Sequence, residues 1–539
     1  MDTNCQYISY QQTGFFSKMV IDYLQQDEKI KPFYKHPVSI DGVRAAIEAR
    51  KATQNHRQIL VEVLKKQYAA FALSTLQERN LNNLLLENTF TITTAHQPNI
   101  FTGHLYFIYK ILHTVKLALD LSAIMPENNF VPVFYMGSED ADLDELGHVF
   151  IDGEKLTWDT EQTGAVGRMK VDKSLLALID RMAGRLEVLP YGKEIMELFK
   201  KAYVIGSTIQ QATLHVVNNL FNNVGLLVLI PDNADLKRPF SQVIKRELKE
   251  RFSHPIVEAT AKKMREHYKV QASGRELNLF YLIDDNRERI EFVNDHFEVK
   301  SLHLKWTEEE IFNEVDVHPE RFSANVILRG VFQEMILPNI AFIGGGGEVA
   351  YWLELKKVFD ACEVPYPVII LRNSFLLATQ LQLNKIEKLG FTIEDFFESE
   401  RTLLDTLVKR ESKQQLTIEN EKQAIIDAYN KIKNFTNKVD VTLKDHVASL
   451  AVKVEKSLLE LEKKMLKAEK KKFQAQARQI QHLKKQLFPQ NSLQERNDNI
   501  AEYYALYGKD LLVNLLEYSL ALEAKFGVLT LPGHPRNIG

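Results

Sequence analysis

The feature that most constrains the fold is a strand–helix–strand pattern between residues 90 and 140. A β-branched and aromatic run, FTITTAHQ, begins at Phe90 and predicts a buried strand. Apolar residues then recur at helical spacing in GHLYFIYKILHTVKLALDLS, and FVPVFYMGSED predicts a second strand that ends in carboxylates. This order favours a parallel pair of strands with a right-handed crossover. The predicted fold class is therefore α/β with a parallel sheet.

Further segments extend the sheet and interrupt it. GLLVLIPD predicts a third core strand, and residues 325–375 return to the core with a glycine run, a helix and the strand YPVIILRN. Residues 149–170 resemble a small β-rich insertion. Residues 279–305 alternate apolar and polar positions around Asp284-Asp285-Asn286, which predicts a hairpin in a second insertion.

The composition changes after Leu376, because Gly and Pro nearly vanish up to Pro489. Apolar residues between 443 and 468 recur close to every 3.5 residues, and the repeat slips near Phe473 before it resumes. We expect a coiled-coil arm, with antiparallel partners in 395–435. The lysine-rich run that follows residue 462 could bind RNA, but such a run is more often the solvated face of a coiled coil.

Charge and cysteine content narrow the classes of protein. The formal net charge of -3 gives the chain no strong bias toward nucleic acid or an anionic membrane. Its two cysteines, Cys5 and Cys362, show no metal spacing and favour a reducing compartment. The first residues lack a basic and apolar leader, and no apolar run reaches the ~20 residues that a membrane helix needs. We expect a soluble cytoplasmic protein.

The first polar motif joins the strand at Phe90 to its helix and contains His96, Gln97, Thr102, Gly103 and His104. Free backbone N–H groups and the helix dipole at such a junction favour an anion or a phosphate. Gly103 would let a ligand approach the backbone, and two imidazoles could donate hydrogen bonds. The alternative is a helix cap by Thr102 with two incidental histidines.

The second motif is an acidic stretch at the end of the next strand, Ser138-Glu139-Asp140-Ala-Asp142-Leu-Asp144-Glu145, followed by His148. Crowded carboxylates repel one another and need a metal, an ammonium partner or water. The amine of an amino sugar or of cysteine would suit them. The alternative is a solvated acidic loop, and no metal ligand can be assigned.

The third motif places four consecutive glycines between an apolar strand, NIAFI, and the helix EVAYWLELKK. We expect an irregular nest of N–H groups around an anion, or else a tight structural turn. Nearby arginines could bind carboxylate or phosphate, or form salt bridges. The candidate residues in and near this motif are Asn325, Arg329, Gln333, Gly344, Gly345, Gly346, Gly347, Glu348, Tyr351, Trp352 and Arg372.

Together these stretches resemble the bacterial cysteine-adding enzymes that complete bacillithiol synthesis. The resemblance runs in order through TTAHQPNIFTGHLYFIYK, VPVFYMGSEDADLDELGH and SANVILRGVFQEMILPNIAFIGGGGEVAYWLELK, from a segment at Phe16–Leu24 to the coiled coil. This chain departs from many relatives, which have Gln and Pro at the positions of His96 and His104 and a His at Ala141. It also lacks the lysine-rich signature loop of the synthetases.

The resemblance implies a Rossmann-like core, akin to class I aminoacyl-tRNA synthetases and nucleotidyl-transferases, with two connective insertions and an α-helical coiled coil that forms a homodimer. The implied organisation is 1–148 for N-terminal helices and the first half of the core, 149–190 for the first insertion, 191–265 for core, 266–324 for the second insertion, 325–375 for the second half of the core, 376–490 for the arm, and 491–539 for helices that return to the core.

The implied reaction joins L-cysteine to the amine of glucosaminyl-malate. On this hypothesis the catalytic residues are His96, His104, Asp140 and Asp142. His96, Thr102, His104 and the glycines would hold phosphate oxygens, an aspartate would orient the sugar ammonium, and Arg329 and Arg372 would bind the malyl carboxylates. The remaining expected substrate-binding residues are Gln97, Gly103, Tyr106, Ser138, Glu139, Asn325, Gln333, Glu348, Tyr351 and Trp352. The cofactor stays open, with ATP or ADP as candidates.

Two other classes of function remain open from the sequence. One is a nucleotide-sensing or RNA-binding scaffold that uses the same core for binding and the basic arm as a contact surface. The other is an aminoacyl- or nucleotidyl-transferase with a different substrate.

Overall fold

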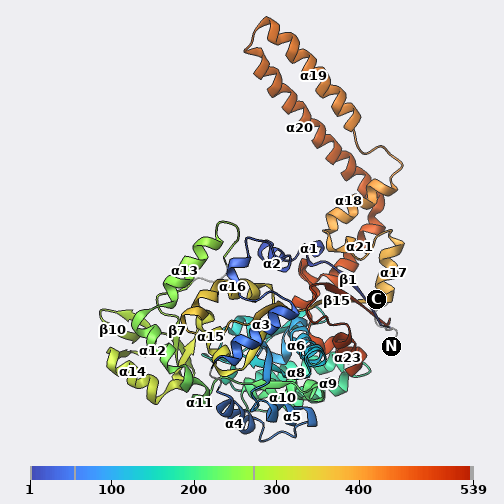
Figure 1. The fold of residues 1–539 in the computed structure, drawn as a ribbon. Coiled ribbons are helices and arrows are strands. Elements are labelled where there is room, and N and C mark those ends of the chain that lie inside the picture. The colour runs from blue at the N-terminus through green and yellow to red at the C-terminus, as the bar shows by residue number, and fades with distance from the viewer. Residues whose placement is uncertain (1–2, 54–55, 271–273, 534–539) are drawn as a thin grey trace. The chain divides into compact units, whose positions relative to one another are not determined.

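The computed structural model describes residues 3–53, 56–270 and 274–533 (Figure 1). The chain divides into two compact units. The core unit comprises Met1–Leu377 and Ser492–Leu529, and the arm unit comprises Ala378–Asn491 and Thr530–Gly539. The core unit is therefore built from two stretches of chain that are separated by more than a hundred residues.

A five-stranded sheet forms the centre of the core unit, in the order β14-β13-β2-β3-β6. All neighbouring strands in it are parallel, which confirms the predicted parallel pair. The chain fills the sheet from β2 outward through β3 and β6, and then returns to add β13 and β14 on the other side of β2. The order of the strands thus reverses between β2 and β13. The strands are β2 Thr89–His96, β3 Asn129–Met136, β6 Leu227–Leu229, β13 Asn339–Gly344 and β14 Val368–Leu371.

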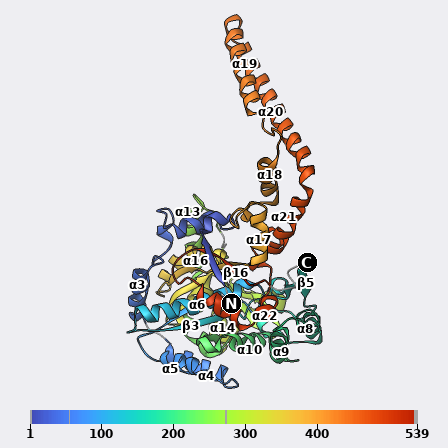
Figure 2. The same cartoon turned by 90° about the vertical axis from the view of Figure 1, so that its right-hand side faces the viewer.

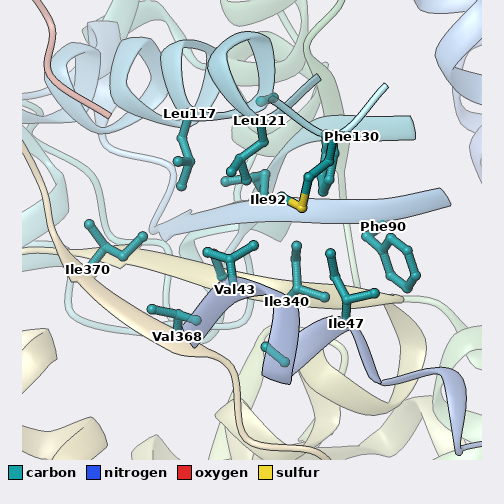
Figure 3. Packing of buried hydrophobic residues seen from close by; sticks show 14 of the residues in the cluster. Val43, Ile47, Phe90, Ile92, Leu117, Leu121, Phe130, Ile340, Val368 and Ile370 are labelled. Carbon is teal, nitrogen blue, oxygen red and sulfur yellow. The ribbon is translucent and has the colours of Figure 1, made fainter. Parts of the chain in front are cut away.

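One face of this sheet packs against two helices, α3 (Ile40–Lys51) and α6 (Leu105–Ile124) (Figure 3). The helices contribute Val43, Ala46, Ile47, Leu117, Ala118 and Leu121 to a buried cluster that also holds Phe90, Ile92, Phe130, Ile340, Val368 and Ile370. Burial of such side chains stabilises the fold by roughly 1.5–3 kcal/mol each. On the opposite face Phe342 of β13 stacks on Trp352, with ring centroids 4.5 Å apart.

The N-terminal region is mostly helical, as expected, with one exception. Its helices are α1 Tyr10–Thr13, α2 Lys18–Leu24, α3 Ile40–Lys51, α4 Arg57–Gln67 and α5 Thr75–Asn83. The exception is β1 (Asn4–Ile8), which joins a second sheet of order β1-β16-β15 with β15 (Ser374–Thr379) and β16 (Phe526–Leu531). The sequence does not predict this strand, because a five-residue strand whose partners lie hundreds of residues away has too short a pattern to detect.

The first insertion holds the predicted β-structure. Its β4 (His148–Ile151) and β5 (Glu154–Thr157) pair as an antiparallel hairpin. The helices that follow, up to and beyond β6, are α8 Lys173–Leu186, α9 Gly192–Ala202, α10 Ile209–Phe221, α11 Ala234–Lys237, α12 Ser241–Glu250 and α13 Ser253–Met264, and a short α7 (Leu143–Leu146) precedes β4.

The predicted hairpin of the second insertion is confirmed. Strands β7 (Leu279–Ile283) and β8 (Asn286–Arg289) pair antiparallel, and Ile283 opposite Asn286 leaves Asp284 and Asp285 as its two loop residues. The other elements of this region are β9 Glu291–Val293, β10 His296–Val299, β11 Leu304–Trp306, α14 Glu308–Val317 and β12 Phe322–Ala324. The chain then returns to the core through α15 (Val326–Ile336) and α16 (Gly346–Ala361).

The arm unit is helical, as the composition predicts. Its helices are α17 Gln380–Lys388, α18 Glu400–Glu411, α19 Glu419–Val439, α20 Leu443–Lys470 and α21 Gln474–Leu487. In Figures 1 and 2, α19 and α20 run side by side, and the short connection between them makes them antiparallel. A 3-10 turn at Lys471–Phe473 separates α20 from α21, where the apolar repeat slips.

The lysine-rich run of the arm is partly neutralised within its own unit. Lys470 forms an ion pair with Asp405, and Lys472 lies 2.7 Å from Glu469. The last helices of the chain, α22 (Ile500–Tyr507) and α23 (Lys509–Glu517), belong to the core unit. None of the helices in the described parts of the chain combines the length and the apolar character that crossing a membrane requires.

Candidate functional site

A cavity of about 490 Å³ opens at the carboxyl ends of β2, β3 and β13. This is the place where the order of the strands reverses, and open α/β sheets bind their ligands at such positions. All three polar motifs contribute to the lining of the cavity. The candidate residues that line it are His96, Gln97, Tyr106, Ser138, Glu139, Asp140, Asn325, Arg329, Gly345, Gly346, Gly347, Glu348, Tyr351 and Arg372.

His96 is the last residue of β2 and is buried, with 6% of its surface exposed. Its ring packs against Tyr106 of α6 with centroids 5.3 Å apart, and its Nε2 has no hydrogen-bond partner among the residues that the structure describes. Burial, helped by the nearby Lys110, holds the pKa of His96 well below its usual value. The imidazole is therefore neutral, and it can serve a ligand through hydrogen bonding rather than through charge.

The four glycines adopt regular structure, which corrects the predicted irregular nest. Gly344 ends β13, Gly345 is the N-cap of α16, and Gly346 and Gly347 form the first turn of that helix. The chain passes from strand to helix without a loop, because Glu348 accepts a 2.8 Å hydrogen bond from the Gly345 N–H and closes the helix start.

The glycines differ in how much space surrounds the position that a Cβ would occupy. A Cβ at Gly344 would lie 2.9 Å from atoms of Phe342 and Glu348, so packing explains that glycine. A Cβ at Gly347 would meet nothing within 4 Å. Gly347 therefore leaves space at a helix N-terminus, where backbone N–H groups lack partners within the helix and the dipole favours negative charge.

Lys110 lines the cavity and was not among the candidates. It is 2% exposed, donates a 2.7 Å hydrogen bond to the Ala95 carbonyl and forms an ion pair with Glu348. Burial lowers its pKa, and Glu348 opposes that effect. The available signal was a lysine one helical turn after Tyr106, placed between the apolar pairs Ile108-Tyr109 and Ile111-Leu112.

Two carboxylates of the acidic stretch after β3, Asp140 and Glu139, have different partners. Asp140 accepts a 3.1 Å hydrogen bond from the Gln97 amide and faces the cavity. Glu139 pairs with Lys237 and accepts a 3.0 Å hydrogen bond from Ser323. The ammonium partner that the crowded carboxylates require is therefore supplied in part by the protein. Among the described residues, no group of three or more acidic, His or Cys side chains is arranged to hold a metal ion.

Three of the arginines that line the cavity have no acidic partner within the described ranges. Arg329 is largely enclosed and donates a 2.9 Å hydrogen bond to the Tyr351 hydroxyl. Burial disfavours its charge, but Tyr351, Tyr135 and nearby carboxylates raise its pKa, so it is cationic. Within the described ranges no carboxylate oxygen lies within 4.0 Å of the guanidinium of Arg329, Arg287 or Arg496. Arg496 is exposed, whereas Arg287 and Arg329 are partly buried. The charges of Arg287 and Arg329 fit an anionic ligand, because a buried charge without a partner is costly.

Arg372 differs from these arginines because its charge is already compensated. Its two terminal nitrogens contact Glu495 at 2.9 and 2.7 Å, and both side chains are buried. Its Nε is buried and has no hydrogen-bond partner in the described part of the chain. Arg372 also lies over the ring of Tyr106, 5.2 Å from the centroid. It can offer one hydrogen bond to a ligand, whereas the two-pronged carboxylate contact expected for it is taken by Glu495.

Seven candidate residues do not line this cavity. Thr102 and Gly103 have positive φ values of 70° and 63° and shape the turn that enters α6. His104 occupies the N-cap position of that helix without a side-chain capping hydrogen bond, and its Nδ1 lies 3.1 Å from the Asn497 carbonyl. Asp142 caps α7 by accepting a 3.0 Å hydrogen bond from the Glu145 N–H. The others, Gln333, Gly344 and Trp352, pack inside the core.

The parallel sheet with its strand reversal, and the polar cavity at that reversal, define a Rossmann-like α/β protein with a small-ligand site. Residues 2–373 match the family model "Bacillithiol biosynthesis BshC, N-terminal Rossmann-like domain", and residues 375–531 match "Bacillithiol biosynthesis BshC, C-terminal coiled-coil domain". The chain therefore belongs to the BshC family of bacillithiol biosynthesis.

Curated relatives match the chain over nearly its whole length. A protein of Flavobacterium johnsoniae is 39% identical, with 98% of this chain and 100% of the relative covered. Proteins of Flavobacterium psychrophilum and Christiangramia forsetii are 38% and 37% identical, each with 98% of this chain and 99% of the relative covered. All three carry the name "Putative cysteine ligase BshC".

Proposed function

We propose that this chain is a cysteine ligase that joins L-cysteine to the amine of glucosaminyl-malate and forms an amide. The names of its relatives support the class of reaction. The observation that carries the proposal is the cavity, in which a largely enclosed Arg329, with no ion-pair partner among the described residues, faces the same space as Asp140. One cavity therefore offers cationic groups for an activated carboxyl and a carboxylate for an amine.

The carboxyl end of cysteine needs activation, because condensation with an amine in water is uphill. ATP or ADP, bound at this cavity, would supply the leaving phosphate or adenylate in this proposal. His96 Nε2, the open first turn of α16 and Arg329 would hold its oxygens and stabilise the charge that develops during transfer. Lys110, already paired with Glu348, would hold that helix start in position.

Asp140 is the better placed of the two candidate aspartates to handle the sugar amine. It faces the cavity, and the Gln97 amide fixes one of its oxygens at 3.1 Å. A carboxylate in this position can orient the ammonium and accept its proton before attack. Asp142 is exposed and its carboxylate caps α7, so in this proposal it supports the loop that carries Asp140.

The test is a direct assay of the purified chain with L-cysteine, glucosaminyl-malate and each of ATP, ADP and other nucleotides, with bacillithiol detected by mass spectrometry. Asp140→Asn should abolish most product formation. Asp144→Asn, four residues further on in α7 and exposed, is the matched control and should retain activity. The proposal fails if no nucleotide supports product formation and Asp140→Asn leaves cellular thiol levels unchanged.

We also propose that the arm unit forms a homodimer through α19 and α20. Large apolar side chains at the end of this helical pair are strongly exposed, with 70% of Phe435, 71% of Val439 and 72% of Val441 open to solvent. A second copy of the chain would cover them. Light scattering should show a dimer that Phe435→Glu converts to a monomer, while Lys438→Glu, a surface charge change in the same helix, should not.

A further inference from the structure

A second cavity of about 350 Å³ adjoins the first and is lined by three arginines, Arg275, Arg287 and Arg289. We call it the arginine groove. It shares Asp140, Arg287, Asn325 and Val326 with the larger cavity, so the two spaces adjoin at these residues. A ligand held at these shared residues would contact both spaces.

The β7–β8 hairpin fixes two of these arginines on one face. Arg287 and Arg289 are two residues apart in β8, so their side chains leave the same side of the strand. Phe280, which pairs with Arg289 across the hairpin, lies beneath both guanidinium groups, at 3.9 Å from Arg287 and 5.7 Å from Arg289. The guanidinium groups are held in place by a ring rather than by a carboxylate.

Among the described residues, no ion pair holds the arginines of the groove. Asp140 is the one acidic residue that lines it, and among the described residues none of the three arginines has a carboxylate oxygen within 4.0 Å. Arg287 donates instead to the hydroxyl of Ser323 at 3.1 Å. Several fixed cations around one carboxylate form a site for a ligand with more than one negative charge.

We infer that the arginine groove binds the two malyl carboxylates of the amine substrate. This inference rests on the proposed function and assigns the groups of its substrate to two places. In glucosaminyl-malate the malyl group is on C1 of the sugar and the amine is on the neighbouring C2, so the amine and the carboxylates must bind side by side. Asp140 lines both spaces, and an amine held by it leaves the malyl group facing the groove.

The assignment also separates the roles of the arginines. Arg372 is paired with Glu495, and Arg329 lies on the side of the larger cavity near Tyr351 and the start of α16. Arg329 then serves the activated cysteine carboxyl, and the groove selects the acceptor. The groove is therefore a specificity site, since it contacts a part of the substrate that takes no part in bond formation.

The test uses Arg275→Gln and Arg289→Gln, whose side chains are exposed and whose loss leaves the core intact. Each should raise the KM for glucosaminyl-malate by about 10-fold, the usual effect of losing one charged hydrogen bond. The KM for L-cysteine should stay within about twofold. Lys305→Gln removes one positive charge from an exposed position of the same insertion, outside both cavities, and should change neither constant.

A second substrate shows whether carboxylates are what the groove binds. Methyl glucosaminide has the same amine but no carboxylates, so wild type and variants should use it equally poorly. Equal effects of the variants on both acceptors, or an unchanged KM for glucosaminyl-malate, would overturn the inference while the proposed function stands.

Calorimetric titration of the full chain with L-malate keeps the inference testable even if no bacillithiol forms. The wild type should bind malate and the double variant Arg275→Gln/Arg289→Gln should bind it at least about 10-fold more weakly. Inorganic phosphate is the competing probe. Tighter binding of phosphate than of malate at these arginines, or malate binding that the double variant retains, would show that the groove is no dicarboxylate site.

Discussion

Arg50 and Arg329 lie near opposite ends of strand β13, and they differ in the partners of their guanidinium groups. At the amino end, Arg50 donates to the Asn339 carbonyl at 2.9 Å, the Glu334 carbonyl at 2.7 Å and the Glu334 carboxylate at 2.8 Å. At the carboxyl end, Arg329 donates to the Tyr351 hydroxyl and lines the cavity. A cation whose hydrogen bonds are all made within the protein supports the architecture. A cation that faces a cavity with open donors points to a ligand.

The strongest test of this difference is Arg50→Ala. Removal of one partner leaves Glu334 buried without its cation, so the free energy of unfolding should fall by about 3–5 kcal/mol. The ligase activity of the molecules that remain folded should be unchanged. Urea denaturation and an active-site-normalised assay measure the two quantities. A selective loss of activity with unchanged stability would contradict the architectural role.

Arg329→Gln should show the opposite behaviour. We expect kcat/KM to fall by about 100-fold or more, as when an enzyme loses one preorganised donor to a developing charge. The free energy of unfolding should stay the same or rise, because the variant no longer keeps a charge without an acidic partner in an enclosed place. The same two measurements apply, and Arg246→Gln on the exposed face of α12 is the control. A destabilisation comparable to that of Arg50→Ala would remove the distinction.

Glu502 sharpens the comparison, because it is a largely enclosed carboxyl that lines neither cavity and forms no ion pair within the described parts of the chain. Burial, together with Asp498, raises its pKa from 4.5 to about 8. The folded state therefore holds an extra proton between these values, and the free energy of unfolding should decrease as the pH rises from about 4.5 to about 8.

Glu502→Gln should remove this decrease and stabilise the chain at pH 8 by on the order of 2 kcal/mol, with little change at pH 4.5. Activity should be retained. Urea denaturation at the two pH values measures the effect, and Glu517→Gln in α23 is the control. A loss of activity in Glu502→Gln would contradict the comparison, because it would show that an ionisable group can be functional without lining either cavity.

The smallest expected effect is on the first turn of α16, which lines the cavity. Gly347→Ala should stabilise the fold by roughly 0.5–1 kcal/mol, since alanine favours a helix more than glycine does and a Cβ meets nothing there. It should nevertheless lower kcat/KM by about 10-fold, because the added methyl occupies space that a ligand's phosphate would need. Gly184→Ala in α8, where a Cβ also meets nothing, is the control and should stabilise without loss of activity.

Local patterns were sufficient to predict the central part of the fold. The β-branched run at Thr89–His96 and the long apolar helix after it are regular over enough residues to specify a parallel pair. The polar residues at its strand ends followed, since the carboxyl ends of parallel strands share one edge. The hairpin at Asp284-Asp285 followed from alternation and a two-residue loop.

Contacts between distant parts of the chain were beyond that reach. The pairing of β1 with β16 joins residues more than 500 positions apart, and the sequence NCQYI contains no pattern that identifies its partner strand. Lys110 and Lys237 are hidden for the same reason, because their carboxylate partners, Glu348 and Glu139, lie far away in sequence. Arg372 was assigned to a ligand because Glu495, 123 residues later, could not be placed beside it.

That separation of 123 residues matters while the chain is being made. A ribosome that has just released Arg372 must still synthesise the whole arm before Glu495 emerges, which takes roughly 6 to 25 seconds at usual elongation rates. Until then the nascent core holds a guanidinium without its counter-ion at the edge of its sheet. The core unit is thus completed only after the arm has been synthesised. Chains that stop within the arm should therefore be bound by chaperones or degraded by proteases more than the full-length chain.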